Sequence, residues 1–499
     1  MTAARPYREE DTAFAVQAPV LIERLGACLP AHGLLIEESE RRAYECDGLS
    51  AFRTLPLVVA IPETVAQVQA VLRVCHELGV PVVARGAGTS LSGGALPHPQ
   101  GLLLSMARFS RILELDTERR LARVQPGVRN LSITETAAPH GLYYAPDPSS
   151  QIACTIGGNI SENAGGVHCL KYGLTVHNVL EVTLVTIEGD IVTVGSRALD
   201  TPGYDLLALV HGSEGMLGVI VEATVRLLPE PLTRQVLMAA FDSAAAAGEA
   251  VAALIAAGTI PAGLEMMDGP AIQAAEDFVH AGYPTDAAAI LLCELDGGEE
   301  EVSADVAHTD ARLRAHGAHD VRLATSAEDR ARFWAGRKAA FPAAGRIAPD
   351  YYCMDGTIPR KHLGPVLTRI SEMARDHGLG VVNVFHAGDG NLHPLILYDG
   401  NQPGELDEAE RLGAEILELC VEVGGTITGE HGVGVEKIDQ MCVQFRESER
   451  ETFFGLKAAF DPDGLLNPGK AIPTLTRCAE YGGMHVHGGE LAHPELERY

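Results

Sequence analysis

Two histidines in the segment VFHAGDGNLHPL are the first residues whose types and spacing could do chemistry. His386 and His393 flank the run AGDGNL, whose glycines disfavour a helix, so GVVNVFHAGDGNLHPLIL predicts a strand, a tight turn and a second strand. With the turn centred on Asp389 and Gly390, the two histidines would fall opposite each other and could share one ligand. Histidine pairs across a hairpin suit metal sites, although two structural histidines would leave the same pattern.

Glu430 and His431 form a second reactive pair, in the segment GGTITGEHGVGVEK. A glycine-rich loop rarely needs a bulky acid and a base for packing. Together with the two histidines, Glu430 would complete a three-ligand metal site with an open position for substrate, and His431 would be free to act as a base. The alternative is that Glu430 and His431 only hydrogen-bond a cofactor or a loop.

Three glycine-rich loops in the first half could hold a long, extended cofactor. The first, ARGAGTSLSGG, follows a predicted strand, but it lacks the lysine of a Walker A loop and the third glycine of a Rossmann fingerprint. Such a loop favours a pyrophosphate held by backbone amides. The small and amide-bearing residues of the three loops are Gly86, Gly88, Thr89 and Ser90; Gly157, Gly158, Asn159, Asn163, Gly165 and Gly166; and Gly212, Ser213, Gly215 and Gly218.

The elements that must position these residues alternate between strand and helix, which predicts an α+β fold. We expect a mostly helical N-terminal segment over residues 1–53, a first α+β domain over 54–231 and a second over 232–425. A C-terminal segment with one helix, 426–475, would complete the active site. The tail, 476–499, carries His485, His487 and His493 and is expected to be a surface or docking segment.

Composition limits the partners. A formal net charge of −29 excludes nucleic acid and an anionic membrane surface as purely electrostatic partners. Ten single cysteines without any CxxC exclude a zinc ribbon or an iron–sulfur cluster within this chain and suggest reduced thiols. The N-terminus lacks an apolar signal region, and we expect no transmembrane segment. The expected location is the cytoplasm, with peripheral attachment to the inner face of the cell membrane through partners.

The loops RGAGTSLSGGA, DPSSQIACTIGGNISENAGG and GSEGMLGVI resemble the FAD-binding domain of the vanillyl-alcohol oxidase/p-cresol methylhydroxylase (PCMH) flavoproteins, over about residues 54–231. The resemblance implies FAD, with residues 85–90 around the pyrophosphate. It is expected to be non-covalent, because no position clearly carries a histidine or cysteine linkage. The implied FAD-binding residues are Arg85, Gly86, Ala87, Gly88, Thr89, Ser90, Pro146, Asp147, Ser150, Gly157, Gly158, Asn159, Asn163, Gly165, Gly212, Glu214, Gly215, Gly218, Ile220 and Asn467.

The second half is similar to the C-terminal domain of FAD-linked D-2-hydroxyacid dehydrogenases through HAGDGNLHPLI, GEHGVG and FDPDGLLNPGK. The resemblance implies a PCMH-type domain followed by an α+β cap or substrate domain and a short C-terminal helical segment. It implies that His386, His393 and Glu430 bind a divalent metal (Zn, Mn or Fe) and that His431 is the base. Arg337, in FWAGRKAAF, would hold the substrate carboxylate. The implied reaction is FAD-dependent oxidation of a small 2-hydroxy acid, with hydride transfer to the flavin.

Two departures from the hydroxyglutarate type of this family favour a small substrate. Cys353 stands where that type has a lysine, and Phe341 stands where it has a threonine. Glycolate, oxidised to glyoxylate, is therefore the expected substrate, and D-lactate, oxidised to pyruvate, is the alternative. Electrons would pass to a quinone or a partner, and the resemblance implies a second flavin-domain subunit and an iron–sulfur subunit.

Two other classes of protein fit less well. A non-catalytic FAD-bearing scaffold subunit should lack the two histidines and the glutamate. An aryl-ether alcohol oxidase needs an aromatic pocket, and aromatic residues make up only 5% of this chain.

Overall fold

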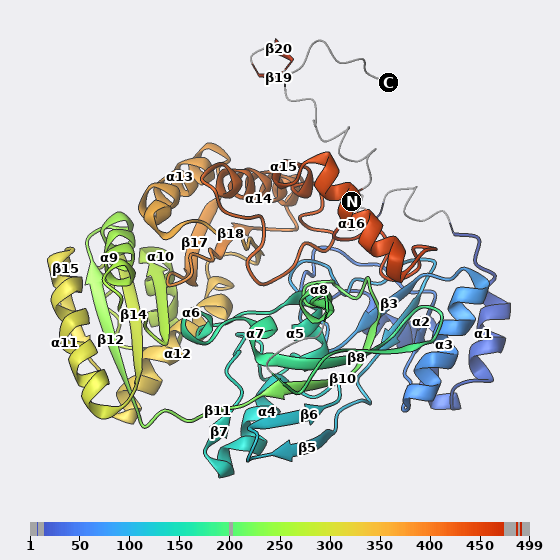
Figure 1. The fold of residues 1–499 in the computed structure, drawn as a ribbon. Helices are drawn as coiled ribbons and strands as arrows, with labels where there is room; N and C mark the ends of the chain where they lie inside the picture. The colour runs from blue at the N-terminus through green and yellow to red at the C-terminus, as the bar shows by residue number, and fades with distance from the viewer. Residues whose placement is uncertain (1–6, 8–13, 199–202, 474–485, 488–489, 492–499) are drawn as a thin grey trace.

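The computed structural model describes residues 7, 14–198, 203–473, 486–487 and 490–491. Two α+β halves lie side by side, the first drawn blue to green and the second green-yellow to orange (Figure 1). Along the chain, the first half ends at β11 (Leu228–Pro229), and the second half begins at β12 (Thr233–Phe241). Of the tail histidines, His485 and His493 lie outside the described residues, and His487 belongs to a short pairing of β19 (Val486–His487) with β20 (Glu490–Leu491).

A four-stranded sheet opens the first half and presents the first glycine-rich loop. Its strands, in spatial order, are β1 (Leu34–Leu35), β2 (Val58–Ala60), β4 (Leu102–Ser105) and β3 (Val82–Arg85). Between the parallel strands β2 and β3 runs α3 (Val65–Leu78), which begins at a capping box on Thr64 and ends at the left-handed Gly79. The strand that was predicted before the first glycine-rich loop is confirmed as β3, and the loop leaves β3 at its carboxyl end.

An antiparallel five-stranded sheet completes the first half. Its strands, in spatial order, are β5 (Ile112–Asp116), β6 (Leu121–Val124), β10 (Val219–Arg226), β8 (Val179–Val185) and β9 (Ile191–Gly195); β7 (Leu142–Tyr143) pairs with β11. Strands β8 and β9 form a hairpin, with Gly189 at φ +82° in its turn. The helices of this half are α1 (Ala18–Gly26), α2 (Glu38–Arg41), α4 (Asn130–Ala137), α5 (Ile156–Glu162), α6 (Cys169–Tyr172), α7 (Thr175–Asn178) and α8 (Leu206–Val210).

A seven-stranded sheet, with all its pairs antiparallel, carries the second half. In spatial order it contains β15 (Ala318–Leu323), β12, β14 (Ala289–Gly297), β13 (Gly263–Asp268), β17 (Gly380–His386), β18 (Pro394–Tyr398) and β16 (Asp350–Cys353). Alternate residues of β12 enter two separate cores, so helices cover both faces. One face carries α9 (Ala244–Ala256), α11 (Glu299–Ala315), α13 (Leu363–Asp376) and α14 (Glu405–Glu422), and the other carries α10 (Gly269–Val279) and α12 (Ala327–Ala344).

The C-terminal segment returns to the first half, where α16 (Glu447–Phe460), drawn red in Figure 1, follows the short α15 (Met441–Gln444). Lys457 Nζ donates to the carbonyl oxygens of Met216, at 2.8 Å, and Leu466, at 2.7 Å. Lys470 Nζ donates to the carbonyl oxygen of Gly94 at 2.9 Å. Buried lysines need such partners, and the bonds to Met216 and Gly94 hold the segment against two of the glycine-rich loops of the first half.

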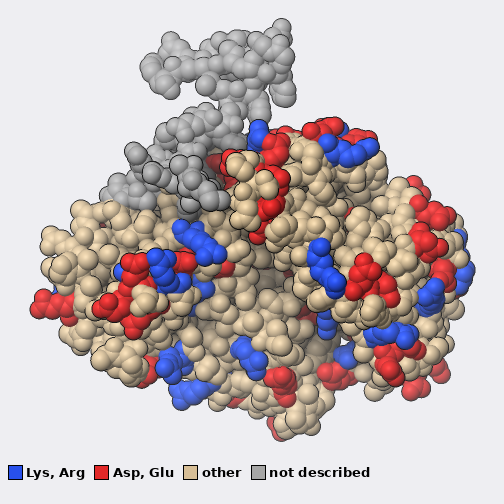
Figure 2. All heavy atoms as spheres, turned by 180° about the vertical axis from the view of Figure 1, so that it is seen from behind, with Lys and Arg blue, Asp and Glu red and all other residues tan. Residues whose placement is uncertain are grey.

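The surface agrees with the acidic composition. On the face shown in Figure 2, Lys and Arg side chains stand interspersed among Asp and Glu rather than gathered into one area. Within the described ranges, no helix combines the length and the apolar character needed to cross a membrane.

His168 joins the two halves through two carboxylates. Its Nδ1 lies 2.8 Å from Asp147 Oδ2, in a glycine-rich loop of the first half, and its Nε2 lies 3.2 Å from Glu294 Oε1, on β14. Burial alone would lower the pKa of His168, but Asp147 and Glu294 outweigh it and raise that pKa well above its usual range. The imidazolium therefore acts as an ionic contact between the halves.

We predict that this contact makes stability depend on pH. The unfolded histidine has a pKa of about 6.5, so the contact contributes fully below that pH, and its contribution is lost as pH rises through the raised pKa of the folded state. His168→Gln should lower the unfolding free energy by about 1–3 kcal/mol near pH 6, with a smaller loss near pH 9. Urea unfolding of both proteins at the two pH values measures this difference. A difference that is constant or grows with pH contradicts the assignment.

Candidate active site

One cavity of about 650 Å³ lies between the two halves. The first half lines it with the three glycine-rich loops, and the second lines it with α12, Tyr351 of β16, His386 of β17 and the Glu430–His431 loop. The predicted FAD-binding residues on its wall are Arg85, Gly86, Ala87, Gly88, Thr89, Ser90, Asp147, Ser150, Gly157, Gly158, Asn159, Glu214, Gly215 and Ile220. The cavity therefore runs from the amide-lined loops to the histidines and the glutamate.

The remaining predicted FAD-binding residues do not line the cavity: Pro146, Asn163, Gly165, Gly212, Gly218 and Asn467. Two of them contact residues that line it. Asn467 Nδ2 donates to the carbonyl oxygens of Gly94, at 3.0 Å, and Glu214, at 2.6 Å. A Cβ on Gly165 would come within 2.4 Å of Glu430 Oε2, so a glycine there lets Glu430 approach.

The first loop fits a bulky phosphorylated ligand. Its glycines carry no side chains, so its backbone can come close to neighbouring groups. A Cβ on Gly86 would lie 2.1 Å from Thr155 Oγ1, and Gly88 has a left-handed φ of +70°. Arg85 is held by a 2.6 Å hydrogen bond from its Nη1 to the carbonyl oxygen of Cys46, and it lines the cavity. The residues present therefore fit a pyrophosphate group cradled by backbone amides and one guanidinium.

A single face of α12 forms the opposite wall. The helix begins at Ser326, whose side chain accepts a hydrogen bond from the backbone of Asp329. Its cavity-lining residues are Trp334, Arg337, Lys338, Phe341 and Pro342, at i, i+3, i+4, i+7 and i+8. The predicted Arg337 is thus in the cavity, whereas Trp334, Lys338 and Tyr351 were missed by the sequence reasoning.

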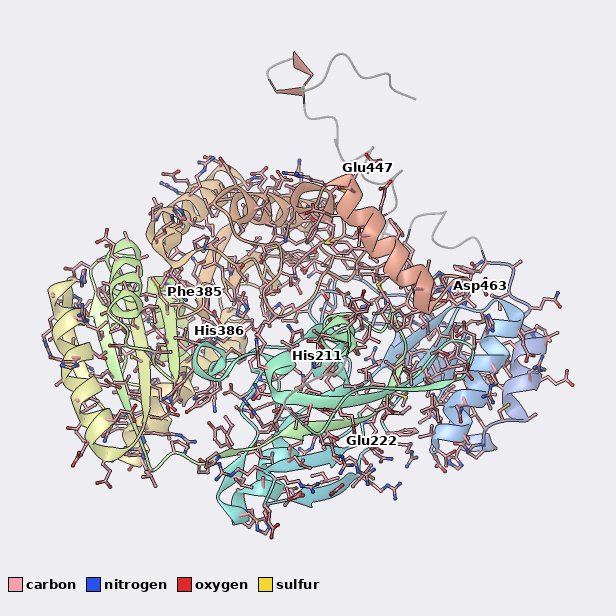
Figure 3. The ribbon with its side chains drawn as sticks, in the orientation of Figure 1. His211, Glu222, Phe385, His386, Glu447 and Asp463 are labelled. Carbon is pink, nitrogen blue, oxygen red and sulfur yellow. The ribbon has the colours of Figure 1, made fainter. Side chains whose placement is uncertain are left out.

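His386 and His393 lie on the predicted hairpin, β17–β18, but the predicted register is wrong. His386 pairs with Asn391 rather than with His393, because the turn is centred one residue earlier, on Gly388 and Asp389, which moves each pairing partner by two residues. A shift of two residues keeps side chains on the same face, so the histidines become diagonal neighbours with ring centroids 5.1 Å apart. His386 sits at the end of β17 on the side toward the first half (Figure 3).

The Glu430 carboxylate reaches both of these histidines. Its Oε1 lies 3.3 Å from His386 Nε2, 3.2 Å from His393 Nε2 and 3.8 Å from His431 Nε2. The imidazole of His431 stacks on that of His393, with centroids 4.8 Å apart and an interplanar angle of 12°. The four predicted chemical groups therefore form one cluster, although His393 lies behind the cavity wall.

Asp355, which the sequence reasoning left without a role, holds the Glu430–His431 loop in place. Its Oδ2 accepts hydrogen bonds from the backbone amides of Gly429 (3.1 Å), Glu430 (3.2 Å) and His431 (2.8 Å). Thr428 Oγ1 donates to the same oxygen at 2.6 Å. The carboxylate is fully buried. In the sequence, Asp355 stands as an acid inside the apolar run YYCMDG. The residues that donate hydrogen bonds to it lie more than 70 residues away along the chain.

Burial and neighbouring charges give Glu430 and His431 different protonation states. Burial alone would raise the pKa of Glu430, but His386 and His393 outweigh it and hold that pKa well below its usual range. Burial lowers the pKa of His431 to about 4, against the opposing effect of Asp355. Glu430 is therefore an anion, and His431 is a neutral imidazole that can accept a proton.

The donor atoms fit a divalent cation. One ligand atom each from His386, His393 and Glu430 lies within 4.8 Å of the others, and Asp355, His393 and His431 form an overlapping set. His393 Nδ1 is buried without a hydrogen-bond partner, and Nε2 lies 3.2 Å from Glu430 Oε1 and 3.5 Å from Asp355 Oδ1. Two imidazoles and a carboxylate are the donor set of three-ligand catalytic metal sites.

Both halves of the chain match families of known proteins. Residues 56–195 match a family model described as an FAD binding domain, and residues 230–471 match one described as FAD linked oxidases, C-terminal domain. The glycolate oxidase subunit GlcD of Escherichia coli strain K12 is 64% identical over 471 residues, which cover 94% of each chain. A D-lactate dehydrogenase of Archaeoglobus fulgidus is 34% identical over 84% of this chain and 92% of that one.

The solved structure of p-cresol methylhydroxylase with substrate bound matches 93% of this chain and 98% of that one, at a TM-score of 0.77 and 18% sequence identity. This likeness confirms the predicted PCMH-type α+β fold. The matches to both halves confirm FAD as the cofactor and an oxidoreductase as the type of enzyme. The chain therefore belongs to the FAD-linked oxidases, in the family that includes the glycolate oxidase subunits GlcD.

Proposed function

We propose that this protein oxidises glycolate to glyoxylate and that it holds its FAD without a covalent bond. One observation carries the proposal: a single cavity joins the amide-lined loops to Arg337, His386, Glu430 and His431. The name of the E. coli relative supports the substrate. In this scheme residues 54–231 are the FAD-binding domain, 232–425 the substrate domain and 426–475 the segment that completes the active site.

The protein's own residues bind and orient the substrate. Arg337 is buried and lines the cavity, where its planar guanidinium suits a carboxylate. His431 accepts the proton of the α-hydroxyl group through its neutral imidazole, while Asp355 holds its backbone. The flavin, when bound, supplies the acceptor for the hydride that leaves the α-carbon.

We propose that His386, His393 and Glu430 hold a divalent metal (Zn, Mn or Fe), which would polarise the α-oxygen of the substrate. The charges around the cluster support this. When the imidazoles are neutral, as metal ligation requires, the carboxylates of Glu265, Asp355 and Glu430 outnumber the cations Arg337 and Lys437. Without further positive charge, an anionic substrate would enter a site that already carries surplus negative charge.

The cavity wall favours a small substrate. The Phe341 ring packs edge-on against Tyr351 and His393, with centroids 6.2 Å from each. Cys353 is buried and uncharged on the same strand as Tyr351. Neither Phe341 nor Cys353 can pair with a second carboxylate, although Lys338 on the same helix as Phe341 lines the cavity. We propose that the ring of Phe341 limits the group attached to the α-carbon to a hydrogen or a methyl.

The electrons would leave through partners, because the chain has no CxxC motif for an iron–sulfur cluster. We propose a second flavin-domain subunit and an iron–sulfur subunit, with a quinone as one possible final acceptor. The word "subunit" in the name of the E. coli relative supports an assembly. In this proposal the enzyme works in the cytoplasm, at the inner face of the cell membrane.

D-lactate is the second candidate substrate, favoured by the A. fulgidus relative. Anaerobic addition of each acid to the purified protein separates the two. Glycolate should bleach the flavin absorption band faster, at limiting concentration, than D-lactate does. A much larger kcat/KM for D-lactate defeats the preference for glycolate.

Arg337→Lys is predicted to weaken substrate binding. Lysine keeps the charge but loses the bidentate fork, so KM for glycolate should rise about 10- to 100-fold with the flavin spectrum unchanged. Steady-state kinetics with an artificial dye acceptor measure this. Arg346→Lys is the matched control, because Arg346 follows the same helix but does not line the cavity. An unchanged KM in Arg337→Lys refutes the role of the arginine.

His386→Ala and Glu430→Ala are predicted to lose bound metal and to lower kcat/KM by about 10²- to 10⁴-fold, while FAD is retained. Elemental analysis, flavin absorbance and kinetics on the same samples provide the three readouts. His377→Ala is the control, because His377 contacts only Glu408 and Glu415 outside the cavity. Full activity in either variant removes the metal from the scheme.

Phe341→Ala is predicted to widen the pocket beside His393. The ratio of kcat/KM for D-lactate to that for glycolate should rise about tenfold, since one methyl group in an apolar pocket changes binding by ~1–3 kcal/mol. Competition kinetics measure the ratio directly. Phe278→Ala, on the exposed side of α10, should leave it unchanged. A fall in the ratio contradicts the assigned wall.

A further inference from the structure

Glu265 lies at the junction between the proposed substrate anchor and a proposed metal ligand. It is on β13, directly opposite His386 on the neighbouring strand β17. Its Oε1 lies 2.7 Å from His386 Nδ1, and its Oε2 accepts from Arg337 Nε and Nη2, at 2.8 Å each. The side chain of Glu265 is completely inaccessible to solvent.

Glu265 does not line the cavity, whereas both of its partners do. It can therefore affect a bound molecule only through Arg337 and His386. Burying a carboxylate costs free energy unless hydrogen-bond donors pair with it. Here three donor groups contact the two oxygens of Glu265. The arrangement ties the orientation of the guanidinium to that of the imidazole.

We propose that Glu265 is a positioning residue that sets both the tautomer of His386 and the plane of Arg337. This inference rests on the metal site of the proposed function. Because an ionised carboxylate only accepts hydrogen bonds, His386 must carry its proton on Nδ1. Nε2 is then the nitrogen left to bind a metal, and it lies beside Glu430 and His393.

A glutamine in place of Glu265 would reverse this tautomer. Its amide oxygen would accept from Arg337, so its NH₂ group would face His386 Nδ1 as a donor. The imidazole would then accept at Nδ1 and carry its proton on Nε2, where it can no longer bind a metal. Arg337 would also keep an uncompensated charge and a weaker partner.

The test uses full-length protein loaded with FAD, freed of metal with a chelator and titrated with Mn²⁺ alone. The dissociation constant for Mn²⁺ should rise about 10- to 100-fold in Glu265→Gln, and KM for glycolate should rise more than kcat falls. An unchanged dissociation constant overturns the inference and leaves the metal site standing. A parent protein that binds no Mn²⁺, Zn²⁺ or Fe²⁺ overturns the metal site itself, and this inference with it.

Asp268→Asn is the matched control for damage to the sheet. Asp268 lies on the same strand and accepts hydrogen bonds from Asn383 of β17, at 2.8 and 2.9 Å, but it lines no part of the cavity. Mn²⁺ affinity should be unchanged in this variant. An equal loss of affinity in Asp268→Asn and Glu265→Gln would mean a general effect of the β13–β17 pairing and would overturn the positioning role.

A second pair of variants covers the case in which Glu265→Gln fails to fold or to keep FAD. Arg337→Gln should retain Mn²⁺ affinity, because His386 still donates to Glu265. The double variant, Glu265→Leu with Arg337→Leu, removes the buried charges together and leaves His386 Nδ1 without an acceptor, so it should lose that affinity. Equal Mn²⁺ affinity in the two variants overturns the inference.

Discussion

The carboxylate of Asp355 accepts hydrogen bonds from the backbone amides of three successive residues, and the geometry of the site depends on this contact. A loop as rich in glycine as the one around Glu430 has many backbone conformations available. Asp355 selects one of them by accepting hydrogen bonds from the loop's amides in a buried position. Glu430 then meets the two histidines of the β17–β18 hairpin, and His431 stacks on His393 at the cavity.

Neither half contains a complete site. The first contributes loops whose amides and small residues admit a phosphorylated cofactor, and the second contributes the acid, the bases and Arg337. Buried polar contacts align them: His168 spans two carboxylates from different halves, and Lys470 ties the C-terminal segment to the first glycine-rich loop region. A site at the boundary between the two halves allows a substrate to be enclosed between rigid walls.

Local patterns in the sequence predicted the loops and hairpins that are formed by neighbouring residues. The loop from Arg85 to Ser90 and the β8–β9 hairpin follow from glycine positions and alternation, and the loop lines the cavity as expected. The register of the β17–β18 hairpin was wrong by two positions, yet the histidines still met because side chains alternate with a period of two. Glu265 and Asp355 escaped notice because their partners are distant in sequence, and no pattern around a single buried acid reveals which strand it will face.

The central claim is that flavin and metal occupy neighbouring parts of one cavity. The most direct measurement is an anomalous difference map from crystals of the protein loaded with FAD and Mn²⁺. We predict electron density for the flavin along the three glycine-rich loops and one anomalous peak bounded by His386, His393 and Glu430. Flavin bound elsewhere, or a peak that lies away from these three side chains, would contradict the account.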